Sequence, residues 1–426
     1  MPVFREPVLN VAVVGGAWHG KSTLIGRLLH ELGRVSDKMV ERMRRLASAL
    51  GHEDSCYAFL VDKGLEERRR GHTLGLKAVR PLKLGRIRLK LIDLPGLLDR
   101  AGEAVPGISQ ADAALVVLSA PELTAKEADL EDLRELLALC AAFGVEQAVV
   151  AVNKMDLAGY GRSAFEKAVR AFEELLREVG WHPKAIYVPV SALKGDNLAE
   201  SSDKMGWHDG PTLLEALERL EVPRRPDEGP VRLPVNRYYD AARAAVGVLR
   251  SGRLRPGDDV LVLPSGVLGQ VSSLQSWGRE LDLALPGEDV GAGLRGVARY
   301  DVKKGSVVCG LRDVPPVARV LRARVRVLRP VELRVGACLT VCCHEAAVPA
   351  RVEAIWSEDG REFKALGLGQ EGEVLLRPLV PERRSLVVEP ASRLRSMGLL
   401  ALRMGGGGLP ATLTVATGGC LAVNEA

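Results

Sequence analysis

The sequence predicts an α/β domain with a mostly parallel sheet, followed by two antiparallel β-barrels. An apolar run, a glycine-rich turn and a helix follow one another within residues 8–29, and further apolar strands then alternate with helical segments. Proline and charged residues crowd residues 221–230, EVPRRPDEGP, as in a linker. Beyond the linker, short alternating strands are separated by a turn about every ten residues. We therefore expect domains at residues 1–222, 229–313 and 314–426.

The composition is that of a soluble globular protein, with 47% hydrophobic and 27% charged residues among 426. The formal net charge of +5 permits a polyanionic partner such as RNA without requiring one. The chain has no apolar stretch of membrane-spanning length, and its first residues, MPVFREP, lack the pattern of a signal peptide. We therefore expect a cytoplasmic protein.

The seven cysteines are scattered and odd in number, which is not the pattern of a disulfide framework. Cys338, Cys342, Cys343 and His344 cluster in a strand-like segment. A metal site is disfavoured there because adjacent strand residues point to opposite faces and no second ligand pair stands at a zinc spacing. We expect buried thiols within a barrel, and a disulfide stays open for a hyperthermophilic source.

A phosphate-binding loop is predicted near the start of the chain. Gly15, Gly20, Lys21 and Ser22 fit G-x-x-x-x-G-K-[ST], with a short buried strand before the motif and a helix after it. Backbone N–H groups of such a loop wrap a polyphosphate, the lysine reaches the β- and γ-phosphates, and the Ser22 hydroxyl ligates Mg²⁺. The nucleotide contacts predicted in this stretch are Gly15, His19, Gly20, Lys21, Ser22 and Thr23.

Two further segments are predicted to complete the Mg²⁺ site. The strand-like residues 86–92, RIRLKLI, end at Asp93-Leu94-Pro95-Gly96. An acid at the carboxyl end of a buried strand places Asp93 in the Mg²⁺ shell and the Gly96 N–H near the γ-phosphate. A helical, charged stretch over residues 35–70 leads into a polar turn, where Thr73 is the candidate for a second hydroxyl ligand.

The base-selecting residues come from the last two strands of the first domain. A helix is expected at about residues 126–143, and the strand after it ends in N-K-x-D, formed by Asn153, Lys154 and Asp156. The Asp156 carboxylate accepts two hydrogen bonds from guanine N1–H and the 2-amino group, a pattern that adenine does not offer. The next strand leads into Ser191, Ala192 and Leu193, where the Ala192 N–H is expected to meet guanine O6. The motifs together predict binding of GTP or GDP with Mg²⁺.

Over essentially its whole length the chain resembles the translation elongation factor 1-alpha family of the archaeal and eukaryotic type, as a divergent paralogue. The resemblance is carried by GKSTLIGRLLHELGRV, VDKGLEERRRGHT, DLPG, NKMD, VPVSALKGDNLAESSDKMGWHDGPTLLEAL and, in the first barrel, ALPGEDVGAGLRGVARYDVKKG. It implies a P-loop GTPase domain with two barrels, GTP hydrolysis, and GTP-dependent delivery of aminoacyl-tRNA or a tRNA-like protein to the ribosome. A nucleotide exchange factor is a further implied partner; a membrane or DNA is not.

The chain departs from this family at the residues of the chemistry. The family's GHVDHGK reads GGAWHGK here, so Trp18 replaces an aspartate while His19 stays. The family's D-x-P-G-H reads DLPGL, and Leu97 marks the lost histidine that orients the attacking water. Leucine neither hydrogen-bonds nor carries charge, so hydrolysis is expected to slow by ~10²–10⁵-fold. His72 stands where the family has an apolar gate, and we hypothesise that His72 restores part of the water positioning.

The barrels have also diverged, which leaves several functions open. The stretches YYDAARAAV and GLLALRMGGGGLPATLTV replace segments that serve aminoacyl-tRNA in the family. A role in ribosome rescue, stalling or dormancy is therefore expected as readily as aminoacyl-tRNA delivery. A GTP-locked ribosome binder without turnover is one alternative. The other is the GTPase subunit of an ATP sulfurylase, which shares the three-domain plan and the nucleotide motifs.

Overall fold

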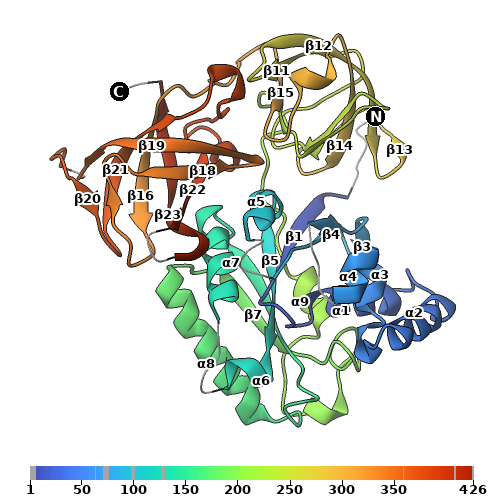
Figure 1. The fold of residues 1–426 in the computed structure, drawn as a ribbon. Coiled ribbons are helices and arrows are strands. Elements are labelled where there is room, and N and C mark those ends of the chain that lie inside the picture. The colour runs from blue at the N-terminus through green and yellow to red at the C-terminus, as the bar shows by residue number, and fades with distance from the viewer. Residues whose placement is uncertain are drawn as a thin grey trace. The chain divides into compact units, whose positions relative to one another are not determined.

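The computed structural model describes residues 6–62, 64–70, 76–96, 101–125, 130–357, 359–406 and 409–424. The chain folds as two compact units that meet in sequence at residues 222 and 223. Residues 108–110 and 142–144 are grouped with the second unit. Figure 1 shows the helices and strands of both units.

The first unit contains a seven-stranded sheet in the order β2-β4-β1-β5-β6-β7, with β3 paired to β4. Its strands are β1 (Val8–Val14), β2 (Lys77–Ala78), β3 (Leu82–Leu84), β4 (Ile87–Asp93), β5 (Ala113–Ser119), β6 (Gln147–Asn153) and β7 (Lys184–Pro189). The neighbours β4-β1-β5-β6-β7 pair in parallel, while β2 and β3 pair antiparallel with β4. Every residue of β1 and β5 is buried, because helices cover both faces of a parallel sheet. The predicted α/β domain is confirmed.

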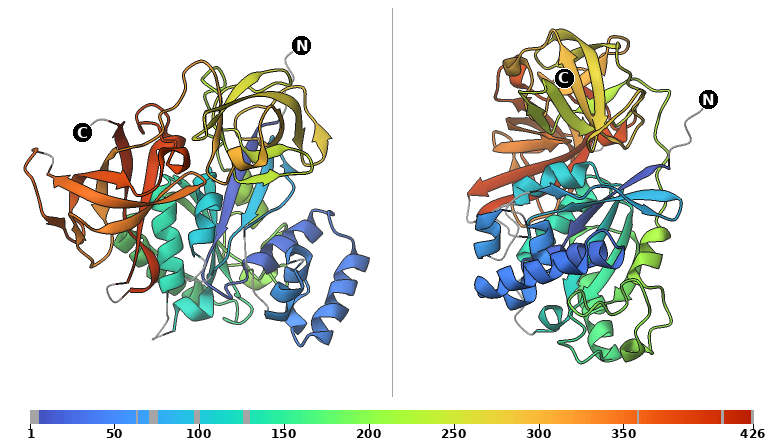
Figure 2. Two further views of the ribbon diagram at one scale, coloured as in Figure 1. Left: turned by 45° about the horizontal axis from the view of Figure 1, so that its top comes forward. Right: turned by 90° about the vertical axis from the view of Figure 1, so that its right-hand side faces the viewer.

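Helices connect the strands of this sheet. They are α1 (Lys21–Glu31), α2 (Asp37–Ala49), α3 (Ala58–Val61), α4 (Leu65–Arg70), α5 (Ala101–Ser109), α6 (Ala120–Leu123), α7 (Glu131–Ala142), α8 (Arg162–Val179) and α9 (Leu213–Glu218). Helices α7 and α8 lie to one side of the sheet and α1 to α4 to the other (Figure 1, Figure 2). The stretch predicted as helical over residues 35–70 is broken into three helices and a short 3₁₀ turn. The helix expected at about 126–143 is described from Glu131 to Ala142.

The second unit is built of antiparallel strands, as predicted. An eight-stranded sheet has the order β8-β15-β11-β12-β14-β10-β9, with β13 on β12, and a closed barrel has the order β16-β21-β19-β18-β22-β23. The sheet strands are β8 (Arg232–Pro234), β9 (Arg237–Tyr239), β10 (Ala244–Val248), β11 (Asp259–Leu263), β12 (Val267–Ser276), β13 (Arg279–Glu280), β14 (Asp289–Arg295) and β15 (Val307–Gly310). The barrel strands are β16 (Leu321–Val327), β18 (Cys338–Cys343), β19 (Ala346–Trp356), β21 (Glu371–Pro378), β22 (Leu399–Gly406) and β23 (Leu409–Val423). A separate pair, β17 (Leu333–Arg334) and β20 (Ala365–Leu366), and the short helix α10 (Arg395–Gly398) complete the unit.

The two parts of the second unit are joined by a buried ion pair. The Arg232 Nε donates to Glu389 Oε1 at 2.6 Å, and both side chains are almost completely excluded from solvent. The strand β8 that carries Arg232 belongs to the eight-stranded sheet, whereas Glu389 precedes helix α10. Removing one partner of such a pair leaves an uncompensated buried charge, so the pair favours one arrangement of these parts.

Most residues of the cysteine cluster around strand β18 are buried. Cys342, Cys343 and His344 are buried, and His344 Nε2 lies 2.9 Å from the Val387 carbonyl oxygen. Cys338 is exposed, which corrects the expectation that all these thiols are buried. All seven cysteines are free thiols, and within the described ranges no three His, Cys, Asp or Glu residues gather as metal ligands. In the same ranges, no helix combines the length and apolarity needed to cross a membrane.

Candidate nucleotide-binding site

Two glycines allow the loop between β1 and α1 to pack tightly. Gly20 has a φ of 95°, and a Cβ there would lie 2.4 Å from Asn153 Nδ2. A Cβ on Gly96 would lie 2.3 Å from Lys21 Nζ and 2.8 Å from the Gly16 carbonyl oxygen. Both positions therefore need glycine, because a side chain would displace the groups that form the phosphate end of the site.

The Lys21 ammonium is held by the loop itself. Its Nζ donates to the carbonyl oxygens of Gly15 at 2.9 Å and Gly16 at 2.8 Å. Burial lowers the pKa of Lys21 from 10.5 to about 8, against the opposing charge of Asp93. A buried cation with so little compensation favours an incoming polyanion, because phosphate oxygens supply the missing negative charge.

Ser22 and Asp93, the two residues predicted to ligate Mg²⁺ from the phosphate loop and from β4, are in direct contact. The Ser22 Oγ donates to Asp93 Oδ2 at 2.8 Å, from the first turn of α1 to the last residue of β4. Burial raises the pKa of Asp93 to about 6, and the nearby Asp62 charge adds to this rise. A hydroxyl beside buried carboxylates is a set of hard oxygen donors, so the residues fit Mg²⁺.

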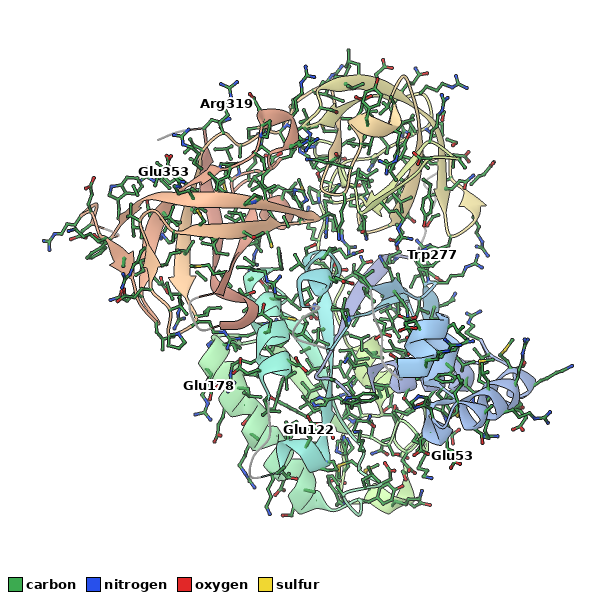
Figure 3. The ribbon with its side chains drawn as sticks, viewed as in Figure 1. Glu53, Glu122, Glu178, Trp277, Arg319 and Glu353 are labelled. Atoms are coloured by element: carbon green, nitrogen blue, oxygen red, sulfur yellow. The ribbon has the colours of Figure 1, made fainter. Side chains whose placement is uncertain are left out.

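The His19 side chain is buried against strand β5. Its ring is 1% exposed and is not part of the cavity lining, so the predicted nucleotide contact of His19 stays a prediction for its backbone. Its Nδ1 lies 3.0 Å from the Val117 carbonyl oxygen, and its Nε2 lies 3.2 Å from Glu122 Oε2. Glu122 belongs to α6, next to β5 (Figure 3). The hydrogen bond from His19 is the main cause that lowers the pKa of Glu122. His19 thus anchors the loop to the sheet.

Asn153 connects the phosphate end with the base end of the site. Its Nδ2 donates to the His19 carbonyl oxygen at 2.8 Å, and its Oδ1 accepts the Ala192 N–H at 2.8 Å. The side chain is buried at the carboxyl end of β6. The Ala192 N–H is thus already donated to Asn153, so the predicted contact with guanine O6 requires that N–H to be shared.

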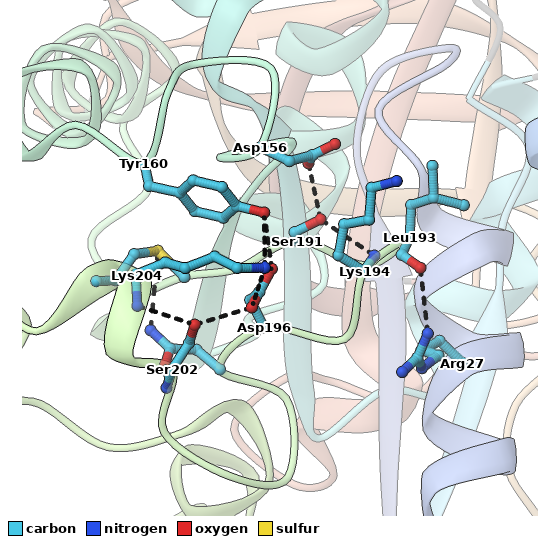
Figure 4. A network of polar contacts seen from close by, with 11 residues as sticks. Arg27, Asp156, Tyr160, Ser191, Leu193, Lys194, Asp196, Ser202 and Lys204 are labelled. Atoms are coloured by element: carbon cyan, nitrogen blue, oxygen red, sulfur yellow. Dashed lines mark hydrogen bonds and ion pairs between the residues drawn. The ribbon is translucent and has the colours of Figure 1, made fainter.

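The Asp156 carboxylate, which is predicted to bind guanine, is held in place by a neighbouring serine. The Ser191 Oγ donates to Asp156 Oδ1 at 2.7 Å and accepts the Lys194 N–H at 3.2 Å (Figure 4). A held carboxylate loses little freedom when a ligand binds, which increases the affinity for a base that matches it.

The loop around Asp196 is braced by a second set of contacts. Asp196 accepts hydrogen bonds from Tyr160 at 2.9 Å and Ser202 at 2.8 Å, and Lys204 Nζ approaches to 3.2 Å. On the other side, Arg27 Nη1 donates to the Leu193 carbonyl oxygen at 3.1 Å (Figure 4). These contacts tie the Ser-Ala-Leu segment to helix α1 and to the loop after β6.

A cavity of about 320 Å³ joins these groups. The sequence-predicted residues on its lining are Gly20, Lys21, Ser22, Thr23, Gly96, Asn153, Lys154, Asp156, Ala192 and Leu193. Three other predicted residues lie outside the lining and each forms a hydrogen bond with a lining residue. Gly15 bonds to Lys21, Asp93 to Ser22, and Ser191 to Asp156. The predicted ligand Thr73, the hypothesised catalytic His72 and the substituted Leu97 lie outside the described residues.

Several residues of the cavity wall belong to no sequence motif of the nucleotide site. Asp54, Ser55 and Ala58 come from the helical region after α2, and Asp62 follows α3. Of these, only Asp62 stood within a stretch quoted for the resemblance, VDKGLEERRRGHT, and no local motif marked it as a site residue. Trp18 also lines the cavity and is 59% exposed.

Comparison with known proteins identifies the family. Residues 6–223 match the domain described as "Elongation factor Tu GTP binding domain". Elongation factor 1-alpha of Pyrobaculum islandicum is 36% identical over 414 residues, which cover 94% of this chain and 92% of that protein. The chain belongs to the elongation factor 1-alpha family. The protein of the same name from Thermoplasma acidophilum is 36% identical over 429 residues, with 98% of both chains covered. The family binds GTP and GDP, so the cavity lies in a GTP-binding domain of a translation-factor GTPase.

Solved structures share the fold at lower identity. The GTPase-like domain of Ski7 from S. cerevisiae, bound to GTP, superposes with a TM-score of 0.78 at 16% identity, over 98% of both chains. Translation elongation factor SelB from Methanococcus maripaludis, in complex with a GTP analogue, gives 0.69 at 16% identity over 99% of this chain and 81% of SelB. At these identities the likeness concerns the fold alone.

Proposed function

We propose that this protein is a GTP-dependent translation factor that acts on the ribosome. The observation that carries the proposal is the single cavity that contains the phosphate-loop Lys21 and Ser22 together with the base-selecting Asp156. This arrangement matches a guanine nucleotide, which has a polyphosphate at one end and paired ring donors at the other. We assign nucleotide binding to residues 1–222 and the two further domains to residues 229–313 and 314–426.

Each side chain of the cavity has a defined task in this proposal. Lys21 leaves the carbonyl oxygens of the loop for the phosphates. Ser22 and Asp93 would hold Mg²⁺, which would neutralise phosphate charge. Asp156 accepts the hydrogen bonds from the guanine edge while Ser191 holds its other face. Asn153 keeps the two ends of the site at a fixed distance, because it bonds to both loops.

The expected partners are the ribosome and a tRNA or tRNA-mimicking protein. Support comes from 36% identity to elongation factors 1-alpha along 94% of the chain, which favours this role over that of an ATP sulfurylase subunit. The net charge of +5 is compatible with an RNA partner. The diverged stretch YYDAARAAV, which runs from the end of β9 into the start of β10, favours a partner other than ordinary aminoacyl-tRNA.

Slow hydrolysis of GTP is part of the proposal. Leu97 follows Gly96 at the position of the family's histidine and offers an attacking water no hydrogen bond. A second function, a GTP-held ribosome binder without turnover, is favoured by this same substitution. Hydrolysis therefore depends on His72 or on a group supplied by the ribosome.

Single-turnover hydrolysis with and without ribosomes tests the proposal on wild type and His72→Ala. Ribosome-stimulated turnover that collapses in the variant would support a relocated catalytic histidine. Tight GTP binding and ribosome binding without turnover in either protein would select the GTP-held binder. Competition of GTP and ATP against a fluorescent GDP is measured first, and equal competition by both nucleotides would overturn the assignment of the cavity.

A further inference from the structure

A buried cluster of charges lies beside the phosphate end of the cavity. Lys77, in strand β2, pairs through Nζ with Asp62 Oδ1 and, at 2.7 Å, with Glu67 Oε1. Only 5% of the Asp62 side chain and 10% of the Glu67 side chain are exposed, against 23% for Lys77. The lysine is thus a fixed cation between two carboxylates rather than a solvated surface residue.

Asp62 belongs both to this cluster and to the nucleotide cavity. It lines the cavity together with Lys21 and Ser22. Its charge raises the pKa of Asp93 after the larger effect of burial, and Lys77 opposes both effects. Lys77 also pairs with Asp93 in the register of strands β2 and β4. The ammonium, the two aspartates and the predicted Mg²⁺ ligand Ser22 therefore occupy one electrostatic neighbourhood.

A Mg²⁺ ion at Ser22 and Asp93 would need further oxygen acceptors. Mg²⁺ keeps several of its waters in such sites, and nearby carboxylates accept their hydrogen bonds. Asp62 lines the cavity, and its charge acts on Asp93, so its carboxylate is placed to offer such an acceptor. The Lys77 ammonium already engages this carboxylate, and it adds a positive charge that repels a divalent cation.

We propose that Lys77 competes with Mg²⁺ for Asp62 and thereby weakens the hold of the site on Mg²⁺ and the nucleotide. The inference rests on the proposed binding of GTP or GDP with Mg²⁺. Its consequence is fast intrinsic release of GDP, so that the protein depends less on an exchange factor. Glu67 keeps the ammonium in place when Asp62 turns toward a Mg²⁺-bound water, so the two arrangements exchange without expelling the lysine.

The test is the rate of GDP release from the full-length protein, followed with a fluorescent GDP over a series of Mg²⁺ concentrations and in EDTA. Lys77→Ala is expected to slow release at saturating Mg²⁺ by about three- to tenfold and to lower the half-saturating Mg²⁺ concentration by a similar factor. Without Mg²⁺ the variant should release GDP at the wild-type rate, because no competition remains. Lys77→Arg, which keeps the cation, should behave as wild type.

Lys83→Ala is the matched control, since it removes the same charge from β3, the next strand along the chain. Lys83 is exposed there and pairs with Glu6. Asp62→Asn should raise the Mg²⁺ requirement, and Lys77→Ala should have a smaller effect in this variant than in the wild type, because only the repulsion between Lys77 and the cation remains to be removed. If Lys77→Ala does not fold, Lys77→Gln gives the same comparison.

Two results would overturn the inference. The first is wild-type release by Lys77→Ala at every Mg²⁺ concentration. The second is a change in the GDP release rate of Lys77→Ala that is equally large with Mg²⁺ and in EDTA, which would show that Lys77 has a structural role only. Failure of the wild-type protein to bind the fluorescent GDP is a separate result, because it would overturn the proposed nucleotide site itself.

Discussion

Replacing Asp93 by asparagine is expected to stabilise the nucleotide-free protein while destroying its Mg²⁺ site. Asp93 is completely buried, and burial, with the Asp62 charge added, raises the pKa of its carboxyl from 3.8 to about 6. A carboxyl whose pKa is higher in the folded state holds its proton more tightly there, so ionisation costs stability. The loss of stability is absent at pH values below the pKa of this carboxyl in the unfolded chain. It reaches its full size once the pH rises past the pKa in the folded protein.

The loss of stability is calculated from the change in the pKa of Asp93 on folding. A rise from 3.8 to about 6 corresponds to about 3 kcal/mol near pH 7.5, at about 1.4 kcal/mol for each unit. Near pH 5 the folded state is mostly protonated at this site, and about half of the cost remains. Asparagine has nearly the same size and can accept the hydrogen bond from Ser22. The expected gain of Asp93→Asn is therefore up to about 3 kcal/mol near pH 7.5 and about half of that near pH 5.

Urea unfolding of the nucleotide-free protein in EDTA at the two pH values measures this gain. Asp209→Asn, which removes the same charge at an exposed position, controls for net charge. With Mg²⁺ and GDP added the order should reverse, because only the wild type gains the full binding free energy. A variant less stable than wild type at both pH values, or a gain that does not change with pH, would refute the reasoning.

Three further substitutions probe the other parts of the site. Asp156→Asn replaces an acceptor by a donor, so GTP affinity should fall by ~10²-fold or more and xanthosine triphosphate should bind better, as measured by competition. Glu122→Gln removes the charge beside the His19 ring, and the looser loop should weaken GDP binding by about three- to tenfold in a fluorescence titration. Arg27→Ala removes the hydrogen bond to the Leu193 carbonyl, and GDP should dissociate a few times faster, at ~1 kcal/mol for the lost bond.

Each of these expectations has its own contradicting result. An unchanged preference for GTP over xanthosine triphosphate would show that Asp156 does not read the base. Wild-type affinity in Glu122→Gln would mean that the Val117 carbonyl alone anchors His19. Arg162→Ala, on the exposed start of α8, serves as control for Arg27→Ala, and equal effects of the two would rule out a specific role for the Leu193 contact.

Sequence patterns were sufficient to predict that the phosphate-loop residues and Asp156 share one site. Lys21, Ser22 and Asp156 were predicted from motifs, and the structure brings all three onto one cavity. Motifs succeed here because the carboxyl ends of parallel strands meet at one edge of the sheet. The motif did not determine which way the His19 ring faces, because a loop histidine can face the ligand or the sheet. Contacts with Val117 on β5 and Glu122 on α6 hold the ring toward the sheet.

The sequence by itself determined the class of this protein, because strand periodicity, glycine spacing and the order of the motifs are properties of short segments. It predicted Lys21 and Asp93 at the phosphate end and Asp156 as the residue that selects the base. Only the tertiary structure decided how these charges are balanced. The pairing of Lys77 with Asp62 and Glu67, and the burial that shifts the pKa of Asp93, arise from segments brought together by the sheet. Such contacts are set by packing across the fold, and spacing along the chain does not encode them.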